Sequence, residues 1–226
     1  MKKLLFSVLF LLVLIPAGFS VDPGAFRFGL KASPTIAWMK SETPEYLQQG
    51  VRVGFNYGFI GDLAIGNFYA FSSGININMT GGKLKYPDNI SDLQSAEITR
   101  TYKLQYVEIP LTIKMHTQEI GYLTYYGRFG AGLGINVRSK AKDSYSSGND
   151  LLTIDRDNIK SETRLFKGSL IVGLGAEYSL GGRTSAVIGL TYNNGFSNVL
   201  KGTNQVIQKK PSALANYVEL TLGIMF

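Results

Sequence analysis

Cysteine is absent from this chain of 226 residues, and histidine occurs once, at His116. Without cysteine the chain can form no disulfide, thiol nucleophile, cysteine-ligated metal site or cysteine-linked lipoprotein anchor. A single histidine that falls in a predicted turn is badly placed to act as the general base of a serine hydrolase. We therefore predict a protein without catalytic residues, cofactor or bound metal.

Only one long apolar run is present, and it lies at the N-terminus. Two lysines precede an apolar stretch over residues 4–15, and small residues follow up to Ser20. This order is typical of a secretory signal peptide over residues 1–20 that is cut after Ser20. An uncleaved anchor is the alternative, but the stretch is short for a spanning helix, which needs about 20 residues. Residues 21–226 then form one domain.

The chain carries a formal net charge of +7 at pH 7. A basic surface of this kind can bind nucleic acid, but an exported chain rarely meets it, so we predict no nucleic-acid partner. Contact with the anionic headgroups of membrane lipid explains the charge better.

Residues 123–137 alternate strictly between apolar residues and residues that are small or polar. The apolar positions are Leu123, Tyr125, Phe129, Ala131, Leu133, Ile135 and Val137, and the others are Thr124, Tyr126, Arg128, Gly130, Gly132, Gly134 and Asn136. A period of two places the two sets on opposite faces of a strand. The polar face is too small and too charged for an ordinary solvent face. We therefore expect the apolar face to contact hydrocarbon.

Seven further segments alternate in the same way. They are predicted as strands over residues 26–38, 51–59, 68–79, 106–115, 166–180, 185–193 and 214–226. Pro34 predicts a bulge or a frayed end within the first of them. Each segment has about the length of a tilted membrane-spanning strand. The pattern predicts an all-β fold, namely an eight-stranded antiparallel up-and-down transmembrane β-barrel closed by its first and last strands, because an open edge in hydrocarbon leaves unpaired backbone groups.

The connections between these strands alternate in length. Those at residues 61–67, 116–121 and 181–184 are short, whereas those at residues 40–49, 81–100, 139–163 and 195–213 are long and polar. Short periplasmic turns and long extracellular loops are typical of barrels in the outer membrane of Gram-negative bacteria. The alternative is a soluble barrel whose apolar faces line a cavity, because alternation alone does not show which face is inside.

Charged side chains recur on the faces that are predicted to point inward. The basic ones are Arg27, Lys31, Arg52, Lys114, Arg128 and Lys167, and the acidic ones are Glu108, Glu177 and Glu219. Eight strands enclose a space only about wide enough for side chains, and charges there need partners. We predict a narrow lumen plugged by ion pairs; a gated path for ions or protons is the alternative. Inward glycines should make room for these side chains: Gly130, Gly132, Gly134, Gly173 and Gly175.

Aromatic residues are expected to form girdles at the two membrane interfaces. The periplasmic set is Tyr57, Phe59, Tyr69, Tyr178 and Phe226, and the outer set is Trp38, Phe166 and Tyr192.

The segment NDLLTIDRDN places Asp155 and Asp157 two positions apart, as in a calcium-binding loop. The glycine turn and the distal glutamate of such a loop are missing, and Arg156 lies between the two acids. We interpret the segment as a solvated loop.

Three stretches resemble the PorT-like family of outer-membrane β-barrel proteins: YVEIPLTIK at residues 106–114, YYGRFGAGLGINV at residues 125–137 and ELTLGIMF at residues 219–226. The resemblance implies an eight-stranded barrel and, in the founding members, a role in a secretion apparatus for C-terminally tagged cargo. It transfers no catalytic residue. Resemblance to outer-membrane proteins in general implies that Phe226 is the terminal aromatic residue read by the barrel-assembly machinery.

The expected function is that of a non-enzymatic integral outer-membrane barrel, either structural or an accessory of secretion or adhesion. The expected partners are outer-membrane lipid, the barrel-assembly machinery and a secretion-apparatus or extracellular protein that contacts the long loops. A barrel that modifies lipid or transports a small hydrophobic ligand is the alternative.

Overall fold

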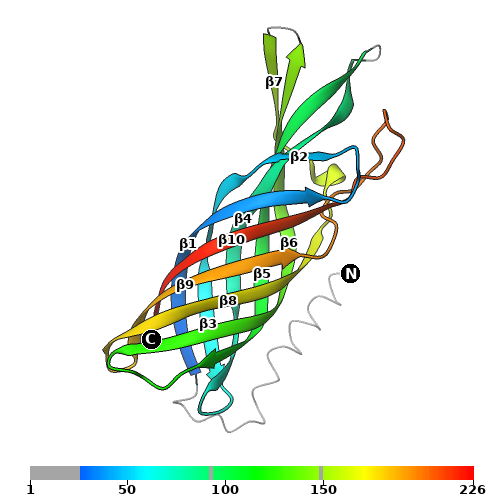
Figure 1. Ribbon diagram of the computed structural model, residues 1–226. Helices are drawn as coiled ribbons and strands as arrows, with labels where there is room; N and C mark the ends of the chain where they lie inside the picture. The colour runs from blue at the N-terminus through cyan, green and yellow to red at the C-terminus, as the bar shows by residue number, and fades with distance from the viewer. Residues whose placement is uncertain (1–25, 92–93, 148–149) are drawn as a thin grey trace, which may run out of the picture.

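The computed structural model describes residues 26–91, 94–147 and 150–226 (Figure 1). The predicted signal peptide lies outside the described residues. The described elements are β1 (Phe26–Ser41), β2 (Leu47–Gly50), β3 (Arg52–Ala64), β4 (Tyr69–Ser91), β5 (Gln94–His116), β6 (Leu123–Ser147), β7 (Asp150–Arg156), the 3-10 helix η2 (Lys160–Glu162), β8 (Phe166–Gly181), β9 (Thr184–Gly195) and β10 (Ala213–Met225). No helix among them is long and apolar enough to cross a membrane.

Eight of these strands form a closed antiparallel barrel (Figure 1). Their order around the barrel is β1, β3, β4, β5, β6, β8, β9 and β10, and β10 pairs again with β1. At this seam Leu30 lies opposite Ile224 and Thr35 lies opposite Glu219. The predicted fold and its closure between the first and last strands are confirmed.

The side chains of β1 show why the strands take this arrangement. Phe28, Leu30 and Ile36 point outward and are about half exposed, whereas Lys31 and Thr35 point inward and are buried. The same alternation holds in the other barrel strands, so the outer surface is apolar and the interior is polar. This orientation excludes the soluble barrel with an apolar cavity, and it suits a barrel surrounded by hydrocarbon.

The expectation of a bulge or a frayed end at Pro34 is wrong. Pro34 lies in register opposite Phe55 of β3, and β1 continues beyond it to Ser41. On the other side, the ladder to β10 passes from Lys31 to Thr35 without a change of register. Proline has no backbone N–H to donate. The sheet accommodates it by leaving out ladder partners on one side.

The prediction of long loops is also wrong for two of the four connections, because these consist largely of strands. β4 runs to Ser91 and β5 begins at Gln94, so residues 81–91 and 94–100 are paired strands. β6 runs to Ser147 and pairs with β7 over residues 141–147. These strand portions and β2, which we call the extracellular extension, project from one end of the barrel (Figure 1). Most of their buried residues are apolar, with Arg100 and Asp143 as exceptions, whereas the buried residues of the barrel within the membrane are mostly polar.

Tyr126 of β6 points into the lumen and fills the space next to two glycines. A Cβ atom at Gly175 or at Gly189 would lie 2.5 Å from Tyr126 Oη. A Cβ atom at Gly130 would instead lie 2.2 Å from the backbone oxygen of Leu111. Glycine is thus required at these inward positions either by a crossing side chain or by the close approach of the next strand. Gly175 makes room for a long side chain, as predicted.

The substitution Gly189→Ala should lower the free energy of unfolding by about 1–3 kcal/mol, since the new methyl group overlaps the Tyr126 hydroxyl. The measurement is the urea dependence of the heat-modifiable gel shift in detergent micelles. Adding Tyr126→Phe removes the overlapping oxygen and should restore most of the loss. A double variant no more stable than Gly189→Ala alone would contradict this packing.

Candidate functional site

An ion pair lies inside the lumen between the neighbouring strands β1 and β10. Lys31 Nζ lies 2.7 Å from Glu219 Oε1, and Asn56 Nδ2 donates to Glu219 Oε2 at 2.5 Å. Thr221 Oγ1 donates to Glu219 Oε1 at 2.9 Å. Both charged residues are buried. The Glu219 carboxylate therefore has donors on both oxygens, as a buried charge requires.

A second ionic cluster fills the periplasmic half of the lumen. Lys114 Nζ lies 2.5 Å from Asp62 Oδ2 and pairs as well with Glu177. Arg27 Nη1 lies 2.7 Å from Glu177 Oε2. Sequence reasoning missed Asp62 because its segment was interpreted as a turn, whereas β3 continues to Ala64 and points Asp62 inward. The signal was present, since Asp62 continues the spacing of the other inward positions of β3.

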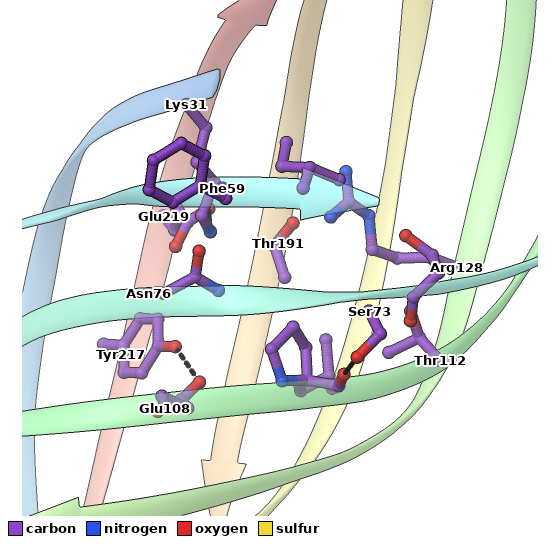
Figure 2. A pocket seen from close by; sticks show the side chains of 14 residues that line it. Lys31, Phe59, Ser73, Asn76, Glu108, Thr112, Arg128, Thr191, Tyr217 and Glu219 are labelled. Atoms are coloured by element: carbon purple, nitrogen blue, oxygen red, sulfur yellow. Dashed lines mark hydrogen bonds and ion pairs between the residues drawn. The ribbon is translucent and has the colours of Figure 1, made fainter. Parts of the chain in front are cut away.

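A third group lies nearer the extracellular end, around Glu108. Tyr217 Oη donates to Glu108 Oε1 at 2.8 Å, and Lys167 Nζ lies 3.2 Å from Glu108 Oε2. Asn193 Nδ2 donates to Glu108 Oε1 at 3.2 Å. Figure 2 shows Tyr217 and Glu108 directed toward each other from different strands. Lys167 Nζ also lies 4.9 Å from the centre of the Tyr217 ring, a cation–π contact.

Two of the predicted interior charges take neutral partners. Arg52 Nη1 donates to the backbone oxygen of Thr80 at 2.5 Å. Arg128 Nη2 donates to Tyr126 Oη at 2.9 Å, and its guanidinium lies 5.1 Å from the centre of that ring. The structure thus brings the other seven predicted charges into ion pairs and leaves these two arginines outside them. Sequence cannot separate the two groups, because pairing depends on side-chain reach across the barrel.

Little free space remains between the lumen groups. A cavity of about 30 Å³ lies beside Lys31, Glu108, Arg128 and Glu219 (Figure 2). This volume holds about two water molecules. A wider vestibule of about 290 Å³ opens at the periplasmic end, where Lys114 and other members of the second ionic cluster line it.

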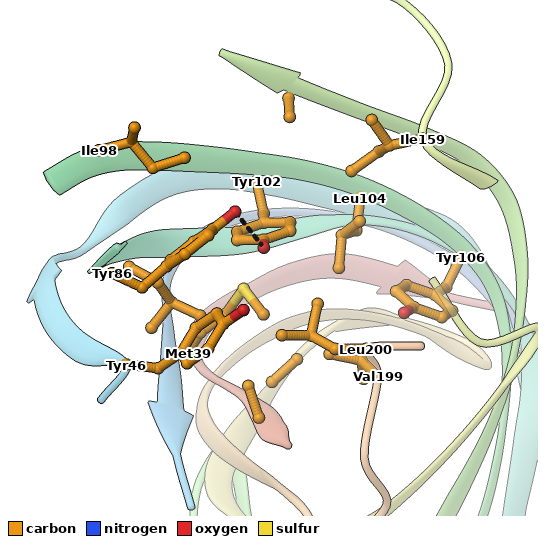
Figure 3. Close-up of a cluster of buried hydrophobic side chains, with 14 of the residues drawn as sticks. Met39, Tyr46, Tyr86, Ile98, Tyr102, Leu104, Tyr106, Ile159, Val199 and Leu200 are labelled. Carbon is orange, nitrogen blue, oxygen red and sulfur yellow. Dashed lines mark hydrogen bonds between the residues drawn. The ribbon is translucent and has the colours of Figure 1, made fainter. Parts of the chain in front are cut away.

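An apolar core that sequence reasoning missed lies inside the extracellular extension and the adjoining ends of the barrel strands (Figure 3). We call it the extracellular core; its members are Met39, Tyr46, Leu84, Tyr86, Ile98, Tyr102, Leu104, Tyr106, Ala141, Tyr145, Ile159, Val199, Leu200, Ala213 and Ala215. The rings of Tyr46 and Tyr86 stack with centres 4.2 Å apart. Burial raises the pKa of Tyr46 to about 12, so its hydroxyl stays neutral and accepts a hydrogen bond from Asn204 Nδ2 at 3.0 Å.

A charged clamp centred on Arg100 joins the two hairpins of the extension. Arg100 binds Asp143 in a bidentate manner, with Nε 2.5 Å from Oδ1 and Nη2 2.7 Å from Oδ2. Its Nη1 donates to Glu162 Oε2 at 2.6 Å, and Arg156 Nε donates to Asp143 Oδ2 at 2.7 Å. Burial acts to lower the pKa of Arg100, but the hydrogen bonds to Asp143 and the electrostatic effects of Tyr86, Tyr102 and Asp143 together outweigh it and raise this pKa above its ordinary value. Arg100 is therefore charged at every physiological pH.

The clamp borders an extracellular pocket of about 260 Å³. Tyr46, Tyr86 and Arg100 form one wall, and the segment from Lys201 to Gln205 forms another.

The remaining predicted positions lie apart from these groups. His116 borders the periplasmic vestibule, with Nδ1 3.1 Å from the backbone oxygen of Thr117. The interpretation of the Asp155 segment as a loop is wrong, because β7 covers Asp150–Arg156 and pairs with β6. Asp155 lies in β7 opposite Lys142, and Asp157 pairs with Lys140. Within residues 26–91, 94–147 and 150–226, no group of three or more acidic or histidine side chains is arranged to hold a metal ion. Phe226 exchanges two backbone hydrogen bonds with Phe28 and extends the seam of the barrel.

Substituting Lys31→Met should lower the free energy of unfolding by about 3–5 kcal/mol, because it leaves the buried Glu219 carboxylate without its counter-charge. Equilibrium unfolding in urea, followed by tryptophan fluorescence in micelles, measures this. The double variant Lys31→Met with Glu219→Gln removes the unpaired charge and should recover more than half of the loss. Equal stability of the single and double variants would show that Glu219 does not depend on Lys31.

Replacing Arg100 by methionine should loosen the extension and leave the barrel intact. Buried Asp143 then loses two hydrogen bonds, so protease added to intact cells should cut the extension at least about tenfold faster, while the heat-modifiable shift of the barrel persists. Lys85→Gln is the control, since it removes only the exposed pair with Glu97. Wild-type cleavage rates in the Arg100 variant would rule out a clamping role.

The family described as outer membrane protein beta-barrel domain matches residues 19–201. No curated protein matches the chain.

Solved structures of other bacterial surface proteins are similar to the chain. Neisserial surface protein A is 16% identical with a TM-score of 0.47, and the alignment covers 88% of this chain and 95% of that one. OprG from Pseudomonas aeruginosa is 10% identical with a TM-score of 0.46, covering 89% of this chain and 96% of its own. Ail from Yersinia pestis is 16% identical with a TM-score of 0.40, covering 89% and 99%.

The family match spans well over half of the chain. The protein therefore belongs to the outer membrane protein beta-barrel domain family, and it resides in the outer membrane of a Gram-negative bacterium, which it crosses with its β strands.

Proposed function

We propose that this protein is a non-enzymatic barrel with a plugged lumen that holds the extracellular extension as a rigid surface for a protein partner. The observation that carries the proposal is the set of buried ion pairs inside the lumen. They are Lys31 with Glu219, Lys114 with Asp62, and Lys167 with Glu108. Tyr217 of β10 also reaches across the lumen to Glu108 of β5. A hydrated solute would have to separate these pairs in a space cut off from bulk water, which costs several kcal/mol for each charge left unpaired.

The extension supports the second half of the proposal. β4, β5 and β6 run without interruption from the barrel into the extension, and the extracellular core fills the space between them. A flexible loop pays ordering entropy when it binds, whereas a surface held by a packed core has already been ordered. This architecture suits presentation of a fixed surface at the cell exterior.

The sites of His116 and Arg100 support the non-enzymatic part of the proposal. His116 borders the periplasmic vestibule, at the opposite end of the barrel from the extracellular pocket beside Arg100. Arg100 itself is engaged by Asp143 and Glu162. General acid–base chemistry needs a titratable group within hydrogen-bond reach of the reacting atoms.

The PorT-like resemblance makes a component of a secretion apparatus one candidate partner, and an extracellular adhesion target the other. The assembly role of Phe226 belongs to the same proposal. Its ring lies 5.6 Å from that of Phe28 at the barrel seam, where β10 must meet β1 for the barrel to close.

Electrical recording tests the plugged lumen. Purified protein inserted into planar lipid bilayers should give no stable conductance steps, because the ion pairs leave no continuous aqueous path. A porin from the same preparation procedure serves as the control for insertion, and gel analysis of the recovered membrane confirms that the barrel is present. Regular steps from the wild-type protein would refute the plugged lumen.

A further inference from the structure

The outer surface at the base of the extension carries a basic patch directly above the apolar band of the barrel. Its members are Lys83 on β4, Lys103 on β5, and Arg138, Lys140 and Lys142 on β6. Lys83, Lys103 and Arg138 are exposed, and Lys140 and Lys142 are partly exposed. The three strands are neighbours in the sheet, so the five cations occupy one continuous surface.

A β-bulge in β6 sets the lower edge of the patch. Tyr106 of β5 lies opposite Asn136 and Gln105 lies opposite Arg138, so Val137 has no partner and the register shifts there. Below the bulge the outward residues of β6 are apolar, ending with Ile135 and Val137. Above it the outward positions change parity and become Arg138, Lys140 and Lys142. The bulge thus turns three cations outward at the point where the apolar surface ends.

The arrangement of these cations is unfavourable by itself. Lys103 lies directly opposite Lys140 in the β5–β6 ladder, and like charges at such positions destabilise a sheet. Two acids lie nearby: Asp157 pairs with Lys140, and Asp155 lies opposite Lys142. Among the described residues, the pair of Lys140 with Asp157 is the only ion pair in the patch. Five cations thus face two carboxylates, and the surface retains a net positive charge.

The pKa of Asp157 reflects the positive charge of the patch. The hydrogen bond from Lys140 holds the pKa of Asp157 below its ordinary value, and the charges of Arg138 and Lys103 act in the same direction. The three cations therefore converge on one place, although Asp157 neutralises only one of them. An additional anion at this place would relieve the repulsion between Lys103 and Lys140.

We propose that the basic patch binds the phosphate groups of a phosphorylated glycolipid in the outer leaflet. The occupant follows from position and charge. The acyl chains of such a lipid would lie along Ile135, Val137 and the apolar residues beside them, and its phosphates would then lie at the height of Arg138, Lys103 and Lys140. Lysine and arginine are the side chains that bind phosphate in this way. A soluble anion would have no use for the adjoining apolar surface.

Binding of lipid A to the purified barrel tests this proposal. Barrels in detergent micelles are titrated with diphosphorylated lipid A, with lipid A from which both phosphates have been removed, and with inorganic phosphate. Native mass spectrometry counts the bound molecules. The wild-type protein should retain diphosphorylated lipid A. The dephosphorylated lipid and inorganic phosphate should each bind at least about tenfold more weakly, because each supplies only half of the contacts.

The triple variant Lys103→Gln, Arg138→Gln and Lys140→Gln should bind diphosphorylated lipid A about a hundredfold more weakly, at about fivefold for each cation. A control variant with glutamine at Lys40, Lys160 and Lys210 loses the same formal charge at exposed positions outside the patch, and it should bind like the wild type. The heat-modifiable shift verifies folding. The single variant Lys103→Gln replaces the triple variant if the latter does not fold.

Three results would overturn the proposal. The first is equal binding of diphosphorylated lipid A by the patch variant and the wild type. The second is equal weakening in the control variant, which would mean that only total charge matters. The third is binding of inorganic phosphate as tight as that of the lipid, since the patch would then be a site for free anions.

Discussion

The obligation to pair every backbone amide within hydrocarbon determines the rest of this structure. It forces β10 to return to β1, and with eight strands the closed barrel encloses a narrow space. Polar groups directed into that space are cut off from bulk water, so each charge there needs a partner. The triad of Asp62, Lys114 and Glu177 is one outcome, and the glycines that admit Tyr126 are another.

Sequence reasoning succeeds where one constraint acts on consecutive residues. Alternation identifies the spanning strands and their inward faces, so Lys31 and Glu219 are correctly placed inside. It fails where the outcome depends on residues far apart. Arg52 and Arg128 look like their paired neighbours in the sequence, yet they reach neutral oxygens in place of carboxylates. Which pairs form depends on strand register and on reach across the lumen, and neither is visible in a single strand.

The extension shows a different failure, because the solvent changes partway along the same strands. Lipid surrounds the lower part of β4 and water surrounds its upper part, so Phe71 points outward below while Leu84 points inward above. Sequence analysis that recognises strands by their outward apolar residues therefore predicts a polar loop for the upper part of β4. The inversion is itself a period-two signal, and the inward run of Leu84, Tyr86, Ile98 and Tyr102 records it once the change of surroundings is recognised.

One continuous sheet thus holds two interiors of opposite character, ionic within the membrane and apolar outside it. A shift of one strand relative to its neighbours would separate ion pairs in the ionic interior. It would also expose apolar side chains of the extracellular core to water, which is unfavourable. Because β4, β5 and β6 pass through both, the extension is held at a fixed height and orientation relative to the bilayer. A surface on it is therefore presented at a defined distance from the lipid headgroups. The bulge at Val137 and the basic patch lie on these same strands. The patch is therefore held at a fixed depth relative to the bilayer.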